Sequence, residues 1–171
     1  MHNKWLHPTQ ALQRQFSVTE TTTATTENKV SETVRRLGFK IGDIGLLIGD
    51  NTISELTDIL PICRIPNTPV HLLGLVNLRG NLTPVFDLHH LLNVTQQQKT
   101  KQMLLVLGRG EKAAGLLIDD LPAHQILLRQ EKLESLPQLT EVIKPFISGG
   151  YKQQNNMWLN FDYQSFFQSL A

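Results

Sequence analysis

Few residues of this chain have the type and spacing that a metal site or a catalytic site requires. His89 and His90 are neighbours, and adjacent side chains on a helix point about 100° apart, so they cannot bind one metal ion from a single face. No third metal-ligating residue follows them at a useful spacing. The sequence therefore predicts no metal site, and we expect both histidines to be solvated or half-buried.

The remaining candidates for catalysis are equally isolated. Cys63 precedes Arg64, which favours thiolate chemistry, but a strand cysteine usually packs as a small hydrophobic residue. Asp119 and Asp120 end an expected strand, where neighbouring side chains face opposite sides. The glycine-rich segment 108–110 lacks the lysine and the helix of a phosphate loop and predicts a hairpin turn. We therefore expect no enzymatic activity and no cofactor.

Composition narrows the choice of function further. The 171 residues carry a formal net charge of +1, so the chain lacks the basic field of a nucleic-acid-binding protein. No apolar run approaches the about 20 residues that span a bilayer, and residues 1–15 lack the apolar segment of a secretory signal, so no direct membrane insertion is expected. The single cysteine allows no intrachain disulfide, in agreement with a reducing compartment.

Polarity divides the chain into a tail and a domain. Residues 1–37 include a threonine-rich stretch with few apolar side chains, which predicts a flexible tail. Residues 38–171 predict one folded domain, with an exposed polar connection near 95–101.

Short apolar runs separated by turn-forming residues dominate the domain. Closely spaced strands without long helices between them predict barrels or a sandwich rather than a parallel sheet. Glycine, asparagine and aspartate mark turns at 42–43, 49–51, 80–81, 108–110 and 149–150. The expected strands are Phe39–Ile41, Ile44–Ile48, Ile53–Leu60, Leu75–Leu78, Leu82–Phe86, Gln102–Leu107, Ala113–Ile118, Ala123–Leu128, Ile143–Ser148 and Met157–Phe161.

Three short helices accompany these strands. Pro69 suits a helical first turn, and Asp87 and Asp162 are good N-caps. The aromatic residues of the last helix lie on one face, which is more typical of core packing than of binding. The expected helices are Thr68–Leu73, Leu88–Leu92 and Asp162–Leu170.

The segment Arg64–Leu92 is the most informative part of the chain. Leu75–Leu78 and Leu82–Phe86 predict two strands joined by a turn, in which Gly80 can adopt a positive φ angle. This segment resembles the signature of the CheW-like family, and the resemblance extends over about residues 38–170. The matching residues are Ile65, Asn67, Pro69, Gly74, Val76, Asn77, Leu78, Arg79, Gly80, Pro84, Val85, Asp87 and Leu88.

The resemblance implies a mainly β fold, with two five-stranded SH3-like barrels around a shared hydrophobic core, short helices and a C-terminal helix. It implies a non-catalytic scaffold that binds the regulatory domain of a CheA-type histidine kinase and the cytoplasmic tip of chemoreceptors. Such a protein would be cytoplasmic and recruited to membrane-associated receptor arrays. The stretches 104–108 and 115–122 look most like adaptors of the branch that serves pilus-driven twitching motility.

The resemblance also implies which residues bind the partners. Ile53 and Glu55 are the candidates for kinase binding, and Arg79 is expected near the receptor groove. The alternatives are a core position for Ile53 and an exposed strand charge for Glu55. For Arg79 the alternative is a local role, in which its donors satisfy nearby carbonyl groups or Asp87.

An apolar groove is the expected recognition mode for a receptor helix. Leu82, Val85 and Leu105 are the candidates for lining it, and all three could equally belong to the core.

Two other functions stay open at this stage. Small β-barrels also bind small molecules or nucleic acids, although the low charge and the 6% aromatic content argue against this reading. The other alternative is a hydrolase that uses Cys63 with a histidine.

Overall fold

The computed structural model describes residues 32–95 and 101–169. Most of the predicted tail and most of the connection near 95–101 lie outside these ranges. The first strand begins at Thr33, ahead of the predicted start of the domain at Gly38.

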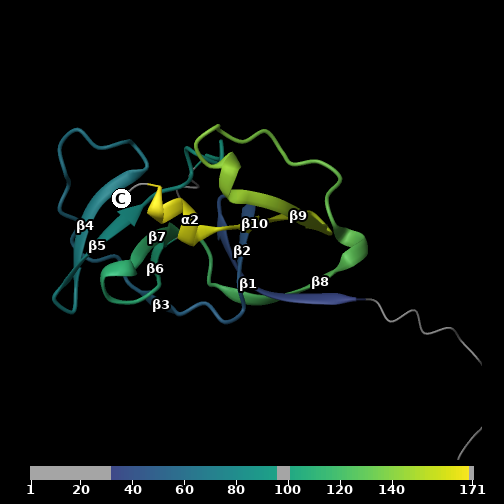
Figure 1. Ribbon diagram of the computed structural model, residues 1–171, viewed down its shortest axis with the longest axis horizontal. Helices are drawn as coiled ribbons and strands as arrows, with labels where there is room; N and C mark the ends of the chain where they lie inside the picture. Colours follow the sequence, from purple (N-terminus) through teal and green to yellow (C-terminus); the bar gives the residue numbers. More distant parts are fainter. Residues whose placement is uncertain (1–31, 96–100, 170–171) are drawn as a thin grey trace, which may run out of the picture. The chain divides into compact units, whose positions relative to one another are not determined.

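Two five-stranded sheets make up the part of the domain that the structure describes (Figure 1). The first sheet has the order β8-β1-β2-β10-β9, and the second has the order β3-β6-β7-β5-β4. Each sheet therefore takes strands from both halves of the chain, and the mainly β prediction with ten strands is confirmed. The strands are β1 (Thr33–Ile41), β2 (Ile44–Ile48), β3 (Ser54–Thr57), β4 (Leu72–Leu78), β5 (Asn81–Phe86), β6 (Met103–Leu107), β7 (Ala114–Ile118), β8 (Ala123–Leu128), β9 (Ile147–Gln153) and β10 (Asn156–Phe161).

Strands such as β2 and β7 are apolar along their whole length because both of their faces are covered. Successive side chains of a strand point to opposite sides. In β2, Leu46 enters a core cluster that both sheets share, whereas Leu47 enters a small cluster inside the first sheet. In β7, Leu116 enters the shared core, whereas Leu117 enters a cluster inside the second sheet. Each sheet thus has an interior of its own, and the predicted shared core lies against both.

The first sheet curls so that its two edge strands are linked. The side chain of Gln153 on β9 donates a hydrogen bond to the carbonyl of Ile126 on β8. The chain that follows β8 then pairs with β9, because the amide of Leu133 donates to the carbonyl of Gly150. These links give the sheet a barrel-like form (Figure 1).

Two predicted helices are absent from the described residues. The predicted helix 68–73 is wrong, because Pro69 closes a turn with Leu72 and the chain then enters β4. Gly74 does not end a helix: its φ is +141°, and a Cβ there would lie 2.2 Å from the carbonyl oxygen of Cys63. Glycine is needed at this position because the Cys63 backbone pairs with Leu75. Residues 88–92 form a turn, closed by a hydrogen bond from the Leu92 amide to the Leu88 carbonyl.

The turn predicted at 149–150 is also wrong, because both glycines lie within β9. A Cβ on Gly150 would lie 2.5 Å from the Trp158 carbonyl oxygen, so glycine allows a close approach of β9 and β10 rather than a chain reversal. The predicted strand 143–148 is accordingly displaced. Lys144–Phe146 form a 3₁₀ turn (η3), and β9 begins at Ile147.

The C-terminal helix α2 (Tyr163–Gln168) is confirmed, together with its cap. The Asp162 carboxylate accepts a hydrogen bond from the Ser165 amide at 3.1 Å. Phe166 is fully buried and its ring contacts the rings of Phe86 and Phe161, so the helix closes one end of the shared core.

Candidate protein-binding site

A two-residue turn between β4 and β5 presents Arg79. Leu78 pairs with Asn81, and both loop residues have positive φ, 51° at Arg79 and 87° at Gly80. Positive φ at both positions is the type I′ geometry that follows the twist of a hairpin. The Asn77 side chain accepts a hydrogen bond from the Gly80 amide at 2.8 Å, which fixes the turn.

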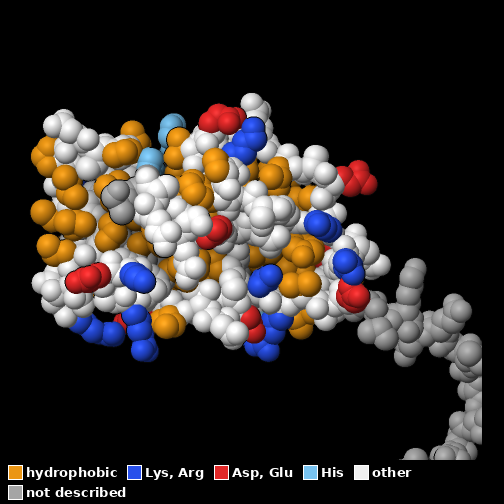
Figure 2. Space-filling model, in the orientation of Figure 1, with side chains coloured by type: hydrophobic (Ala, Val, Ile, Leu, Met, Phe, Trp, Pro, Cys, Tyr) orange, Lys and Arg blue, Asp and Glu red, His pale blue; other side chains and the backbone are white. Residues whose placement is uncertain are grey.

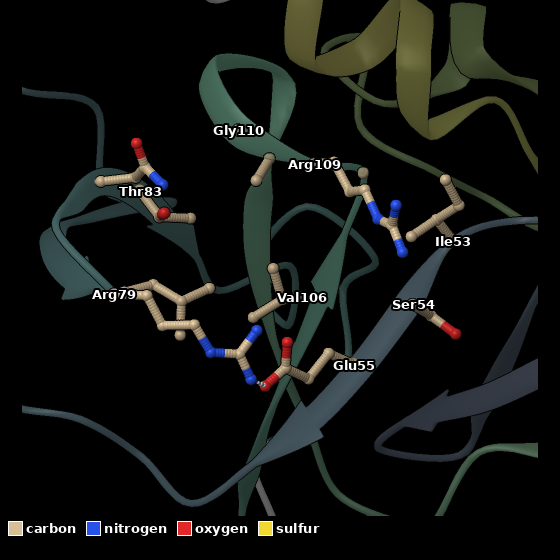
Figure 3. Close-up of a pocket in the computed structure, with 12 residues that line it drawn as sticks. Ile53, Ser54, Glu55, Arg79, Thr83, Val106, Arg109 and Gly110 are labelled. Carbon is tan, nitrogen blue, oxygen red and sulfur yellow. Dashed lines mark hydrogen bonds and ion pairs between the residues drawn. The ribbon is translucent and has the colours of Figure 1, made fainter.

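Arg79 pairs with Glu55, so two residues predicted for different partners are in contact. A guanidinium nitrogen lies 2.5 Å from a Glu55 carboxylate oxygen (Figure 3). The pair connects β3, at one edge of the second sheet, to the hairpin at the other edge. The side chains are 74% and 38% exposed, and pairs this exposed contribute at most about 1 kcal/mol to stability. Asp87, the alternative partner of Arg79, binds His89 instead.

A polar pocket of about 210 Å³ opens beside this ion pair, at one end of the second sheet (Figure 3). Ile53 lines it and is 51% exposed, so it is not a core residue. Arg109 and Thr83 also line it, and neither was singled out as a site residue from the sequence. Arg109 follows β6, in the segment predicted as a hairpin turn, and β6 does pair with β7 in antiparallel fashion.

The structure separates the three apolar residues predicted for receptor binding. Leu82 is 71% exposed and remains available to a partner. Val85 lies inside the second sheet and Leu105 lies in the shared core, both fully buried, which is the core alternative. Their side chains face inward because the alternation along β5 and β6 places them there.

An apolar groove exists elsewhere, between β5 and α2. It has a volume of about 340 Å³ and is lined by Leu72, Pro84, Phe86, Tyr163 and Phe167 among others. Figure 2 shows hydrophobic side chains gathered over the end of the domain that carries β4 and β5. Periodicity in the sequence could not identify this groove, because it depends on how the helix lies across the hairpin.

A buried ionic network lies apart from this surface. The Nδ1 atom of His89 is 2.6 Å from an Asp87 oxygen, and Nε2 is 2.6 Å from an Asp119 oxygen. The same Asp119 oxygen accepts a hydrogen bond from the Gly42 amide, in the turn between β1 and β2, and Gln102 donates to the other oxygen. The prediction of a solvated or half-buried His89 is therefore wrong, because two strand ends enclose the ring.

The carboxylates decide the protonation of His89. Burial alone would lower its pKa, but hydrogen bonds from the ring to Asp87 and Asp119, together with their charges, raise the pKa above the usual 6.5. Burial would also raise the pKa of Asp87, yet the hydrogen bonds from the His89 side chain and amide hold it below 3.8. The network joins Asp119, at the end of β7 in the second sheet, to the β1–β2 turn of the first sheet, so it links the two sheets.

The parts of the chain that the structure describes contain no formed metal site. No group of three or more histidine, cysteine, aspartate or glutamate side chains there is arranged to hold a metal ion. Cys63 is exposed, in contrast to the buried position usual for a strand cysteine.

The comparisons with known proteins agree on one family. A model of the CheW-like domain matches residues 35–171. The chemotaxis protein CheW of Helicobacter pylori is 31% identical over 108 residues, which cover 63% of this chain and 65% of that protein. Protein PilI of Pseudomonas aeruginosa is 27% identical over 126 residues, covering 73% of this chain and 70% of that protein. The chain thus spans just under two thirds of the length of the Helicobacter relative.

A solved structure has the same fold. The scaffolding protein TtCheW from Thermoanaerobacter tengcongensis superposes with a TM-score of 0.63 over 84% of this chain and 94% of its own, at 21% identity.

Proposed function

The chain belongs to the CheW-like domain family, and we propose that it is a non-catalytic adaptor that couples chemoreceptors to a CheA-type histidine kinase. The observation that carries the proposal is the exposed patch of Ile53 and the Glu55–Arg79 pair, which the fold assembles from separate segments. An exposed apolar residue beside an ion pair of little value to stability is available for protein binding. Relatives named CheW and PilI support this class of function over a ligand-binding or nucleic-acid-binding barrel.

The adaptor would act by holding the receptor and the kinase in register with each other. Ile53 and Glu55 are proposed to contact the regulatory domain of the kinase, and Arg79 and Leu82 the cytoplasmic tip of the receptor. Because Glu55 and Arg79 are paired, the two contact regions adjoin at this ion pair. A receptor that shifts its contact at Arg79 could therefore alter the contact at Glu55, provided that the two states differ in their contacts there.

We propose a cytoplasmic location at membrane-associated receptor arrays. No helix in the described residues is long and apolar enough to cross a membrane. The proposal covers both flagellar chemotaxis and pilus-driven twitching. The PilI relative, at 27% identity, falls within the range of 25% to 31% that the CheW relatives span.

Exchange of the two charges tests the proposal directly. We expect Glu55→Arg to weaken co-elution with the cognate kinase and Arg79→Glu to weaken binding to the receptor, while both variants change the melting temperature little, because the pair is exposed. The double variant restores the ion pair with the two charges exchanged between positions 55 and 79. If Glu55 and Arg79 contact the kinase and the receptor, the double variant stays defective in binding both.

Two outcomes would contradict the proposal. Full recovery of kinase and receptor binding in the double variant would assign the pair a purely structural role. Failure of the wild-type chain to bind either partner would remove the adaptor function itself.

A further inference from the structure

The pocket beside the Glu55–Arg79 pair carries an unbalanced positive charge. Its lining includes three charged side chains, Glu55, Arg79 and Arg109. Glu55 and Arg79 neutralise each other at 2.5 Å. Arg109 is exposed, and none of the ion pairs within 4.0 Å among the described residues includes it. The net charge of the lining is therefore +1.

The tightly folded backbone of the loop places Arg109 at the rim of the pocket. Gly108 has φ +87°, and a Cβ there would lie 2.6 Å from the Lys112 carbonyl oxygen, so the loop is tightly folded. The Gly108 amide also donates a hydrogen bond to the Ile53 carbonyl at 2.9 Å. Figure 3 shows Arg109 on the side of the pocket near Ile53, away from Arg79.

A buried hydroxyl favours a polar occupant. Thr83 lines the pocket, is only 1% exposed, and its hydroxyl has no hydrogen-bond partner. An apolar occupant would leave this group unsatisfied, whereas an oxygen-bearing group that enters the pocket can accept its hydrogen bond.

We infer that this pocket accepts an acidic side chain of the kinase, whose carboxylate pairs with Arg109. The inference rests on the proposed function and adds to it the chemistry of the partner. Arg109 is thus a specificity residue: it selects a partner surface with an aspartate or glutamate opposite the pocket. A pairing of this kind also speeds association and weakens with salt.

Charge reversal at Arg109 provides the test, with the full-length chain and its purified cognate kinase. We expect Arg109→Glu to weaken the affinity about tenfold at low salt, and Arg109→Lys to retain most of it. The matched control is Lys112→Glu on the same loop, which lines the apolar groove rather than this pocket. The affinity of the control should stay within about twofold of the wild type. Melting temperatures establish that all variants fold.

The outcomes separate this inference from the proposed function. If the wild-type chain binds the kinase and Arg109→Glu binds equally well, the inference is overturned and the adaptor function stands. Equal weakening by Arg109→Glu and Lys112→Glu would assign the effect to general surface charge and also overturn it. Absence of any wild-type binding would contradict both.

Discussion

His89 lies between two carboxylates that its neutral form cannot satisfy. A neutral imidazole has one donor and one acceptor nitrogen, whereas both ring nitrogens of His89 are 2.6 Å from carboxylate oxygens. Two carboxylate acceptors call for two donor nitrogens, which agrees with the raised pKa of His89. The consequence is a buried positive charge whose loss would leave a carboxylate of Asp87 or Asp119 facing a lone pair.

This arrangement predicts a pH-dependent contribution to stability. The raised pKa of His89 gives stabilisation that is present below 6.5 and lost as pH rises through the higher folded value. The lowered pKa of Asp87 gives stabilisation that is present above 3.8 and lost as pH falls through the lower folded value. We expect the difference in unfolding free energy between wild type and His89→Gln to shrink as pH rises from about 6 to about 9. Urea unfolding across that range measures it.

The control is His90→Gln, an exposed neighbour whose difference from wild type should not follow this trend. His71 is also buried, and burial, followed by the charge of His90, lowers its pKa. Its titration is common to wild type and His89→Gln, so it cancels in their difference. A difference that is constant with pH would show that folding leaves the pKa of His89 unshifted, and a difference that grows with rising pH would show that the buried ring is neutral.

Trp158 on β10 sets the spacing within the first sheet. The ring lies over two glycines, Gly38 on β1 and Gly45 on β2, where no side chain could fit. A Cβ on Gly45 would lie 2.2 Å from a ring carbon of Trp158. The strands therefore need glycine at these positions for packing, and neither residue requires positive φ.

Substitution of Gly45 tests this element. Gly45→Ala should destabilise the domain by about 1–3 kcal/mol, because the added methyl group overpacks the sheet interior. Gly49→Ala is the matched control, since its Cβ would meet nothing closer than 3.4 Å. Thermal or urea unfolding compares the two, and equal stability of both variants would refute the packing role.

At the scale of the whole molecule, the shared core couples the two sheets. It includes Ile41 and Leu46 from the first sheet and Leu105 and Leu116 from the second. Because neither sheet can lose this contact without exposing the other, we expect the domain to unfold as one cooperative unit.

Leu105→Ala should lower the stability by about 2–5 kcal/mol and shift the unfolding of both sheets together. In a Trp5→Phe background, Trp158 is the only tryptophan and its fluorescence follows the first sheet, while circular dichroism follows both. Leu82→Ala is the control, because an exposed side chain contributes little. Separate transitions by the two probes would show that the sheets unfold independently.

Local sequence determined the strands, most of their turns and the C-terminal helix. Apolar alternation, the glycine of the Arg79-Gly80 turn and the Asp162 cap act within a few residues, so their effects can be read along the chain. The signature of Arg64–Leu92 in turn identified the family. The helix predicted at 68–73 is wrong. Pro69 suits the first turn of a helix, but the chain pairs with β5 from Leu72 onward.

The tertiary structure alone decided which residues meet. β5 and β7 pair in parallel, so their carboxyl ends are neighbours, and this places Asp87 and Asp119 on the two sides of His89. β3 and the β4–β5 hairpin lie at opposite edges of the second sheet. Glu55 and Arg79 meet because this sheet curls and brings the two edges together. Such contacts depend on strand order and sheet curvature, which are set by the packing of the whole chain and leave no periodic signal in the sequence.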